Sequence, residues 1–437
     1  MPIPAIPKYY PDAKLQEASP GLRFAMLLPI WTRSADLRSQ SNWQLDTKNN
    51  QDRKLADMLK LNAKDKDLLH ALIARQRGLA MAQTASSVFV VDAQNTAPFT
   101  TGLGNEHPLE NGFAFLHPYG LPYLAGSGVK GVLRQSAGEL AAGLFADDSG
   151  WQAEAMSTAD GQPIADGMPP ENMPDMQWTS SRIDALFGHA AGEGQAEHLR
   201  GALTFWDVIP TIQGGCLSTE IMTPHQAHYY QQKRESKSGN SLSPHDSGQP
   251  VPIQFLAIPP GSTFTFYVTC DCAYLQRLAP DLLVNDAWKY LLRRAFEHAF
   301  DWLGFGGKTA VGYGAMRFDA AAMQAYQALR EQQQHEAEQA RMSPEERERQ
   351  AAQQALSSAI NTFREKFSKA KQAGPFNPGG AFNAERLAFL EAVDQWTDTQ
   401  ALREAVALLD ESLAWGPPSR NKKTMINERM AGLRSRL

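Results

Sequence analysis

Residues 286–318 read DAWKYLLRRAFEHAFDWLGFGGKTAVGYGAMRF, and this stretch decides how the middle of the chain folds. Residues 286–303 predict a helix, because apolar side chains recur every three or four positions. The members of this stripe are Trp288, Leu291, Leu292, Ala295, Ala299, Trp302 and Leu303. Gly304 follows where glycine commonly ends a helix. The glycine loop, residues 304–314, is therefore expected to connect a helix to the short strand YGAMRF.

The glycine loop has the composition of a nucleotide-binding motif but not its spacing. A Walker loop needs a glycine five residues before the glycine of Gly-Lys-Thr, and Trp302 occupies that position. A dinucleotide fingerprint also fails, because Thr309 stands where its third glycine belongs. Two interpretations stay open for the loop alone. Its amides and Lys308 hold a phosphate, or it is a tight connection with Lys308 in solvent.

A second cluster, GSGVKGVLR at residues 126–134, has the same ingredients at the expected start of a helix. Free amides and the helix dipole favour an anion at such a position. Lys130 and Arg134 are four residues apart, so both project from one face. Ser127 is the expected N-cap. The alternative is that the glycines allow close helix packing and both cations face water.

The remaining patterns predict an α+β fold. Strands are expected at SSVFVVDA (86–93), ALTFWDVI (202–209), IQFLAI (253–258) and TFTFYVTC (263–270). Together with the two helices and YGAMRF, these segments contain the order strand, helix, strand, strand, helix, strand. That order is typical of a ferredoxin-like unit, the scaffold of RNA-recognition modules.

Composition changes along the chain predict four regions. They are an N-terminal helical region at 1–86 packed on the core, a ferredoxin-like core at 87–319 with insertions at 146–180 and 231–250, a polar helical linker at 320–374, and a small helical C-terminal appendage at 375–437.

Overall composition limits the classes of function. The net charge is −5, so the whole molecule has no positive field that would attract nucleic acid. Any polyanion must therefore be held by local clusters. The three cysteines lack the layout of a zinc site, and we expect no metal or other cofactor. The N-terminus does not resemble a signal peptide and no stretch is long enough to span a bilayer, so we expect a cytoplasmic protein.

Three motifs in a fixed order resemble a known family. The segment ENGFAFLHPYGLPYLAGSGVKGVLR (110–134) resembles the signature of the RAMP superfamily of CRISPR-associated proteins. DALFG (184–188) with GALTFWDVIP resembles the segment that follows it, and the glycine loop resembles the C-terminal glycine-rich loop of the superfamily. The combination of His117 with TPHQAHYY (223–230) is similar to the RAMP subunit that caps the type III-B, or Cmr, effector complex.

This resemblance implies a noncatalytic subunit of an RNA-guided interference complex. Such a subunit holds the 3′ region of a guide RNA and its paired target. The implied partners are guide (CRISPR) RNA, target RNA, other RAMP subunits and the small helical subunit, with no membrane. Target cleavage in such complexes belongs to a different subunit, and neither Asp207 nor Asp246 is a convincing catalyst here.

The candidate RNA-binding residues come from both glycine-rich clusters. They are Gly126, Ser127, Gly128, Lys130, Arg134, Gly304, Gly306, Gly307, Lys308 and Thr309. A second set suits a thumb-like excursion that contacts the duplex by stacking and charge: His225, His228, Tyr229, Tyr230, Lys233 and Arg234.

Two other functions remain open at this stage. One is a RAMP endoribonuclease that processes CRISPR repeat RNA, with His117, His225 and His228 as candidate bases. The other is a purely architectural subunit that contacts protein alone. The basic C-terminal run is a further candidate for contact with RNA or a partner, and its cations are Arg420, Lys422, Lys423, Arg429, Arg434 and Arg436.

Overall fold

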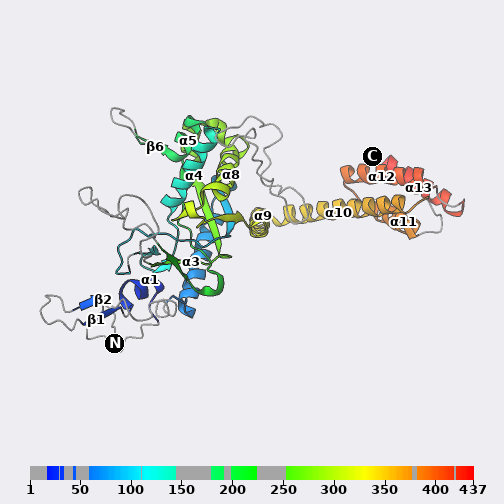
Figure 1. The fold of residues 1–437 in the computed structure, drawn as a ribbon. Coiled ribbons are helices and arrows are strands. Elements are labelled where there is room, and N and C mark those ends of the chain that lie inside the picture. Colours follow the sequence, from blue (N-terminus) through cyan, green and yellow to red (C-terminus); the bar gives the residue numbers. More distant parts are fainter. Residues whose placement is uncertain are drawn as a thin grey trace. The chain divides into compact units, whose positions relative to one another are not determined.

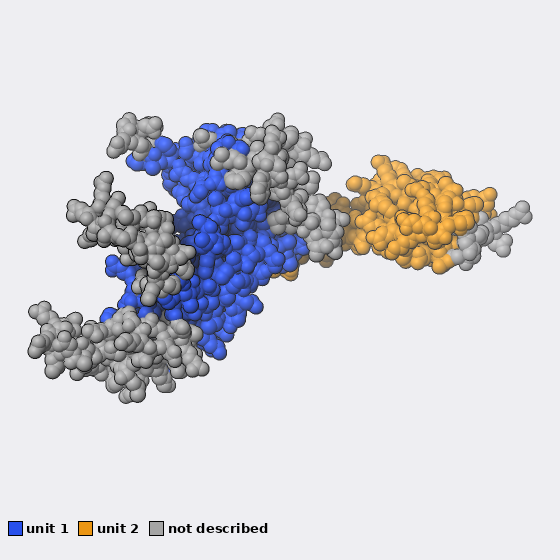
Figure 2. All heavy atoms as spheres, viewed as in Figure 1, with its two compact units in different colours: residues 1–328 blue, residues 329–437 orange. Residues whose placement is uncertain are grey.

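The computed structural model describes most of the chain and divides it into two compact units (Figures 1 and 2). The described residues are 17–28, 30–33, 43–45, 59–109, 111–143, 179–190, 198–223, 252–375, 381–417 and 420–437. Unit 1 is Met1–Ala328 and unit 2 is Leu329–Leu437. Almost all of the expected insertion at 146–180, and all of that at 231–250, lies outside the described residues. No helix in the described ranges is long and apolar enough to cross a membrane.

A four-stranded antiparallel sheet is the centre of unit 1. Its strands are β3 (Val88–Asn95), β8 (Leu203–Phe205), β11 (Thr263–Cys270) and β12 (Met316–Phe318). They lie in the order β12, β3, β11, β8. Helix α4 (Gly126–Ala141) connects β3 toward β8, and α8 (Ala287–His298) lies between β11 and β12 along the chain. The six elements follow one another as strand, helix, strand, strand, helix, strand.

Helices α4 and α8 pack together on one face of this sheet. The ring of Phe266 on β11 lies 5.2 Å from that of Phe296 on α8, edge to face. The hydroxyl of Ser136 on α4 donates to the carbonyl of Ala295 on α8 at 2.7 Å. The expected apolar stripe of α8 is buried at Trp288 and its neighbours, because those side chains face the sheet. The periodicity therefore predicted the buried face as far as Ala299, but Trp302, also expected in the stripe, is 44% exposed in the π-helical turn Ala299–Leu303 that follows α8.

Helix α3 (Ala63–Met81) contacts the opposite face of the sheet. It begins with a capping box in which Asn62 and Asp65 each accept from the other's backbone amide. Its Ala80 packs with Val88 and Tyr267 of the sheet. Residues 1–86 were expected to form a helical region packed on the core. The structure instead adds an antiparallel pair, β1 (Trp31–Arg33) with β2 (Trp43–Leu45), after the short helices α1 (Pro20–Leu22) and η2 (Arg23–Leu27).

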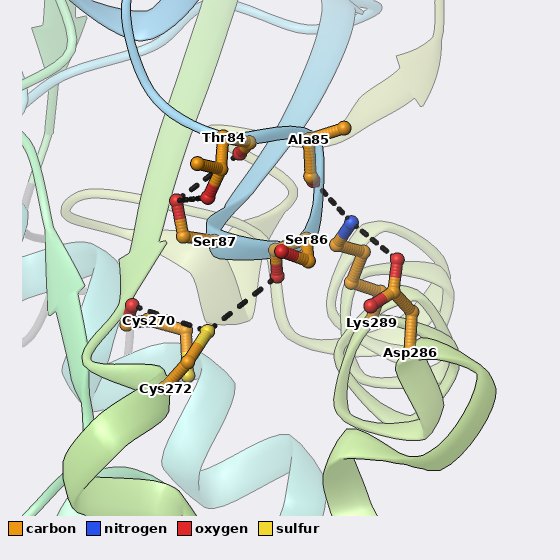
Figure 3. Close-up of polar contacts among 8 residues, drawn as sticks. All are labelled: Thr84, Ala85, Ser86, Ser87, Cys270, Cys272, Asp286 and Lys289. Atoms are coloured by element: carbon orange, nitrogen blue, oxygen red, sulfur yellow. Dashed lines mark hydrogen bonds and ion pairs between the residues drawn. The ribbon is translucent and has the colours of Figure 1, made fainter.

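The turn between α3 and β3, η3 (Ala85–Ser87), is fastened from two sides (Figure 3). The ammonium of Lys289 on α8 donates to the carbonyl of Ala85 at 2.5 Å and to the Asp286 carboxylate at 2.7 Å. The thiol of Cys272 donates to the carbonyl of Ser86 at 3.7 Å. Cys272 begins α7 (Cys272–Leu278), which leads through η8 (Pro280–Asp286) into α8. This set of contacts holds the start of β3 against the helix layer.

Smaller elements surround the main sheet. The strand pairs are β4 (Phe115–Leu116) with β5 (Leu121–Pro122), β6 (Gly188–His189) with β7 (Leu199–Arg200), and β9 (Ser218–Met222) with β10 (Ile253–Ala257). The short helix α5 (Ser180–Phe187) precedes β6. The expected strand 253–258 is thus real, but it pairs with β9 in a separate hairpin and not with the main sheet.

Unit 2 is helical and has its own core. Its helices are α10 (Pro344–Gln372), α11 (Ala381–Val393), α12 (Thr399–Trp415) and α13 (Arg420–Ser435), preceded by part of α9 (Ala320–Arg341). The three C-terminal helical patterns were expected. The linker at 320–374, however, does not stay polar, because Ile360, Phe363 and Phe367 of α10 are buried in this core. The rings of Phe363 and Phe389 stack at 4.2 Å.

The two ends of the glycine loop pack against the sheet and the helix layer of unit 1. It follows the π-helical turn η9 (Ala299–Leu303), and Gly304 ends that turn with φ +68°, as expected for a helix-ending glycine. The Phe305 ring is fully buried against Phe266. The amide of Gly314 donates to the Pro98 carbonyl at 2.8 Å. The two ends of the loop therefore belong to the core of unit 1, whereas residues 310–312 are exposed.

Two glycines of the loop provide a matched test of this packing. Gly306 and Gly312 both have φ +90°, but a Cβ at Gly306 would overlap the Thr100 carbonyl oxygen, whereas one at Gly312 meets nothing within 4 Å. Gly312→Ala should cost about 1 kcal/mol of unfolding free energy, from the backbone conformation alone. Gly306→Ala should cost about 1–3 kcal/mol more, from overpacking. Equal losses in denaturant unfolding would contradict the described loop packing.

Candidate nucleic-acid interface

The start of α4 is held by a residue from a distant segment. The amide of Gly126 donates to the Asp207 carboxylate at 2.8 Å. A Cβ at Gly126 would overlap the carbonyl of Phe205, so this helix start needs glycine. Ser127 was expected to be the N-cap, but the N-cap is Ala125 and no side chain of α4 caps the helix. Asp207, weighed as a catalyst, instead supplies the missing acceptor.

The exposed face of this helix start carries the expected polar groups. Ser127 and Gly128 are exposed, and Lys130 is half-buried. Arg134 lies 4.0 Å from the Asp184 carboxylate of α5, and both side chains are more than a third exposed, at 45% and 37%. Such an exposed pair contributes little to stability. Arg134 is therefore able to exchange Asp184 for another anion.

Lys130 and Arg134 project from the same helix face, as their spacing predicted. Among the residues that the structure describes, Lys130 makes no ion pair. Val129, Leu133 and Ala137 form the buried stripe on the other side. The arrangement leaves one free ammonium and one weakly paired guanidinium beside an exposed serine and glycine. Groups of this kind suit a phosphate.

The glycine loop has fewer free backbone amides than its sequence indicated. A nest of free amides was expected, but the Gly304 amide donates to Ala299 at 2.8 Å and the Gly307 amide donates to Thr100 at 2.7 Å. These two amide hydrogens are already used by backbone carbonyls. Thr309 is half-buried and begins the turn η10 (Thr309–Val311). The amide cradle expected from these two glycines is therefore not formed.

Lys308 lies in the left-handed region with φ +60°, and its side chain turns toward the β9–β10 hairpin. Its ammonium lies 2.7 Å from the sulfur of Met222 and 5.2 Å from the ring centre of Phe255. A cation over an aromatic face is attracted by the ring quadrupole. Lys308 therefore fastens the loop to the hairpin, and it is half-buried.

Tyr313 makes a second connection to the same hairpin. Its hydroxyl donates to the Glu220 carboxylate at 3.2 Å, and its ring lies 5.6 Å from that of Phe255. Burial, with a smaller contribution from Glu220, raises the pKa of Tyr313, so it stays a neutral donor. Nothing in the local sequence marks this pairing, because Glu220 and Tyr313 are 93 positions apart. Sequence reasoning missed both hairpin contacts.

The proposed thumb residues lie outside the described residues. They are His225, His228, Tyr229, Tyr230, Lys233 and Arg234. Asp246 also lies outside the described residues. Their segment leaves the described chain after β9 and returns before β10. The last pair of that hairpin is Met222 with Ile253. Lys308 therefore contacts Met222, two positions before the first residue outside the described ranges.

Other titratable groups of unit 1 have structural roles. His298 is buried and lies 2.6 Å from the Glu139 carboxylate, joining α8 to α4. Burial alone would raise the pKa of Glu139, but hydrogen bonds from His298 and Gln135 outweigh it and lower that pKa. His117 is exposed in the turn after β4. Within the described part of the chain, no cluster of histidine, cysteine and acidic side chains suits a metal ion.

The basic C-terminal run is largely used within unit 2. Arg429 lies 3.4 Å from Glu391 and 3.6 Å from Asp394, and Arg434 lies 2.6 Å from Asp410. Arg436 donates to the carbonyls of Asp394 and Trp396. Lys422 and Lys423 remain exposed on α13, which Arg420 begins. The run therefore offers fewer free cations than its sequence suggested.

Comparison with known proteins places the described core in a family. The model of the RAMP superfamily matches residues 82–317, more than half of the 437 residues. The CRISPR system Cmr subunit Cmr6 of Pyrococcus furiosus is 28% identical over 234 residues. That match covers 49% of this chain and 63% of the relative, so the chain spans less than two thirds of that subunit.

Solved structures give partial likenesses. A type III-B Cmr-beta complex bound to cognate target RNA contains a chain with TM-score 0.33 and 16% identity, over 61% of this chain and 69% of that chain. Cmr6 from Pyrococcus furiosus gives TM-score 0.28 and 21% identity, over 53% and 97%. TM-scores this low do not establish a shared fold, so the assignment rests on the sequence match. From that match, the chain belongs to the RAMP superfamily.

Proposed function

We propose that this chain is a Cmr6-like RAMP subunit of a type III-B CRISPR complex and that it holds RNA without cleaving it. The observation that carries the proposal is Lys130 at the start of α4, which makes no ion pair with the described residues and lies in a segment that the family model covers. The relative is a subunit of a Cmr system, and this chain takes the same role here.

The architecture of unit 1 supports this role. The strand order β12, β3, β11, β8, with two helices on one face, fits a ferredoxin-like, RRM-like unit. RNA-recognition modules use that scaffold to present side chains to RNA. In this proposal the helices after Ala320 form an appendage to the RAMP core that serves contact with neighbouring subunits.

The proposed RNA contacts are with the phosphate backbone. Lys130, Arg134 and the exposed Ser127 and Gly128 bind phosphate at the start of α4. Lys308 provides a further cation from the glycine loop, where its ammonium lies over the ring of Phe255. Phosphate contacts fix position without reading sequence. This property suits a subunit that serves guides of many sequences.

The proposed partners follow from the same role. They are the 3′ region of the guide RNA with its paired target, the other RAMP subunits and the small helical subunit of the complex. A net charge of −5 disfavours nonspecific attraction to RNA over the whole surface. Local cations therefore carry the affinity, and its dependence on salt should be modest.

Removing two cations from α4 tests the RNA contact. Lys130→Ala with Arg134→Ala should weaken binding of single-stranded RNA and reduce the slope of log K against log salt by roughly 0.7 per lost phosphate contact. Fluorescence anisotropy titrations at several salt concentrations measure both. The charge-matched control is Arg294→Ala with Arg403→Ala, because both residues are exposed on other helices. An equal slope in the two double variants would contradict the proposed site.

A cleavage assay tests the noncatalytic role. The purified chain, incubated with labelled CRISPR repeat RNA in the absence of added metal, should leave the RNA intact. Gel electrophoresis over several hours measures this. Specific cleavage that disappears in His117→Ala, His225→Ala or His228→Ala variants would favour the endoribonuclease instead.

A further inference from the structure

A pair of lysines meets a glycine turn at the far end of α3 from the interface above. The members of this α3 lysine site are Lys60, Lys66, Gly214 and Gly215. Lys60 forms an isolated antiparallel bridge with Cys216, and the Leu61 amide donates to the Gly215 carbonyl at 2.9 Å. Gly214 and Gly215 belong to the turn η6 (Gln213–Gly215). The two segments are therefore joined along their backbones.

Gly215 is the place where Lys66 lies against the turn. A Cβ at Gly215 would stand 2.6 Å from Cε of Lys66 and 2.9 Å from its Nζ. A Cβ at Gly214 would meet nothing within 4 Å, although both glycines have positive φ, +70° and +64°. The missing side chain at Gly215 thus makes room for the Lys66 ammonium beside the turn.

The charges of this site are not balanced by acids in the described residues. The nearby Asp65 carboxylate is buried and pairs with Arg23 at 3.0 Å. Glu17 pairs with Lys64 at 3.2 Å. Lys60 and Lys66 are exposed, and the described part of the chain gives neither ammonium a carboxylate partner.

Two further features oppose this concentration of positive charge. Lys64 and Lys66 lie in the first turn of α3, where the helix dipole disfavours cations. Cys216 does not provide the missing negative charge, because burial raises the pKa of its thiol more than Lys60 and Arg23 lower it. The site therefore lacks a compensating negative charge among the described residues.

The α3 lysine site connects to the α4 interface through α3 itself (blue in Figure 1). The side-chain amide of Gln76 donates to the Asp207 carbonyl at 2.7 Å, and Asp207 also accepts from the Gly126 amide at the start of α4. Lys66 and Gln76 are ten residues apart on α3, which is about 15 Å along the helix axis. At about 3.4 Å per nucleotide of a stacked strand, roughly four nucleotides span that distance.

We infer that Lys60 and Lys66, over the Gly214–Gly215 turn, form a second phosphate-binding site for the RNA strand that contacts α4. This inference rests on the proposed RNA-binding function and adds a path for the strand along α3. A single small anion fills one such site. One cationic site at the start of α3 and another on α4, which Gln76 of α3 approaches through Asp207, suit a polynucleotide.

A double variant tests the charge contribution. Lys60→Ala with Lys66→Ala should weaken binding of a 20-nucleotide oligouridine and reduce the salt slope by roughly 0.7 per lost contact. Lys64→Ala is the control within the same helical turn, because it removes the same charge as Lys66→Ala from a residue paired with Glu17. Lys66→Ala alone should weaken binding more than Lys64→Ala does. Equal effects of these two single variants would overturn the inference.

A glycine pair tests the geometry without changing any charge. Gly214→Ala and Gly215→Ala introduce the same side chain into similar backbone conformations, but Gly215→Ala alone displaces Lys66. Gly215→Ala should therefore weaken binding of the oligouridine, and Gly214→Ala should leave it near that of the natural chain. If Gly215→Ala does not fold, as judged by its thermal melt, the lysine variants decide.

The outcomes separate this inference from the proposed function. Loss of binding in Lys130→Ala with Arg134→Ala, but not in Lys60→Ala with Lys66→Ala, would overturn the α3 lysine site alone. A natural chain that binds no RNA would overturn both. Weakened binding in both double variants, with a further loss when all four substitutions are combined, would support one strand contacting both sites.

Discussion

A cluster of phenylalanine rings is the packing on which the rest of unit 1 depends. Phe266 of β11 lies 5.2 Å from Phe296 of α8 and 5.1 Å from Phe305 of the glycine loop, and Phe300 lies 5.7 Å from Phe305. One group of side chains thus joins the sheet, the helix layer and the loop. Because a close-packed core leaves little room for movement, the contacts of the Phe305 ring with Phe266 and Phe300 fix the backbone of the loop at that point. Gly306 and Gly314 allow the loop backbone to lie against neighbouring backbone, where a Cβ would overlap a carbonyl oxygen.

This constraint changes which part of the molecule carries accessible positive charge. The glycine loop uses amides of Gly304 and Gly307 internally and holds Lys308 over an aromatic ring. At the start of α4, Lys130 makes no ion pair with the described residues, and Arg134 lies 4.0 Å from the partly exposed Asp184 carboxylate. The first turn of α3 adds Lys66 beside Gly215. On a chain whose net charge is −5, a few such positions account for local attraction of a polyanion better than the whole surface does.

Local patterns in the sequence predicted the elements that depend on neighbouring residues. The stripe of α8, the helix end at Gly304 and the strand at Val88–Asn95 follow from periodicity and glycine chemistry. Contacts between distant segments were not predictable in this way. Asp207 capping Gly126 and Lys308 meeting Met222 join residues 81 and 86 positions apart. The sequence also did not predict the α3 lysine site, because Lys66 and Gly215 lie far apart in the sequence and form no motif.

Photo-cross-linking tests most directly whether RNA lies along α3 and α4. Single-stranded RNA carrying 4-thiouridine is irradiated with the full-length chain, and the cross-linked peptides are mapped by mass spectrometry. The account predicts cross-links within Ala63–Met81 and Gly126–Ala141, lost together when salt is raised. Cross-links confined to Leu329–Leu437 would contradict it.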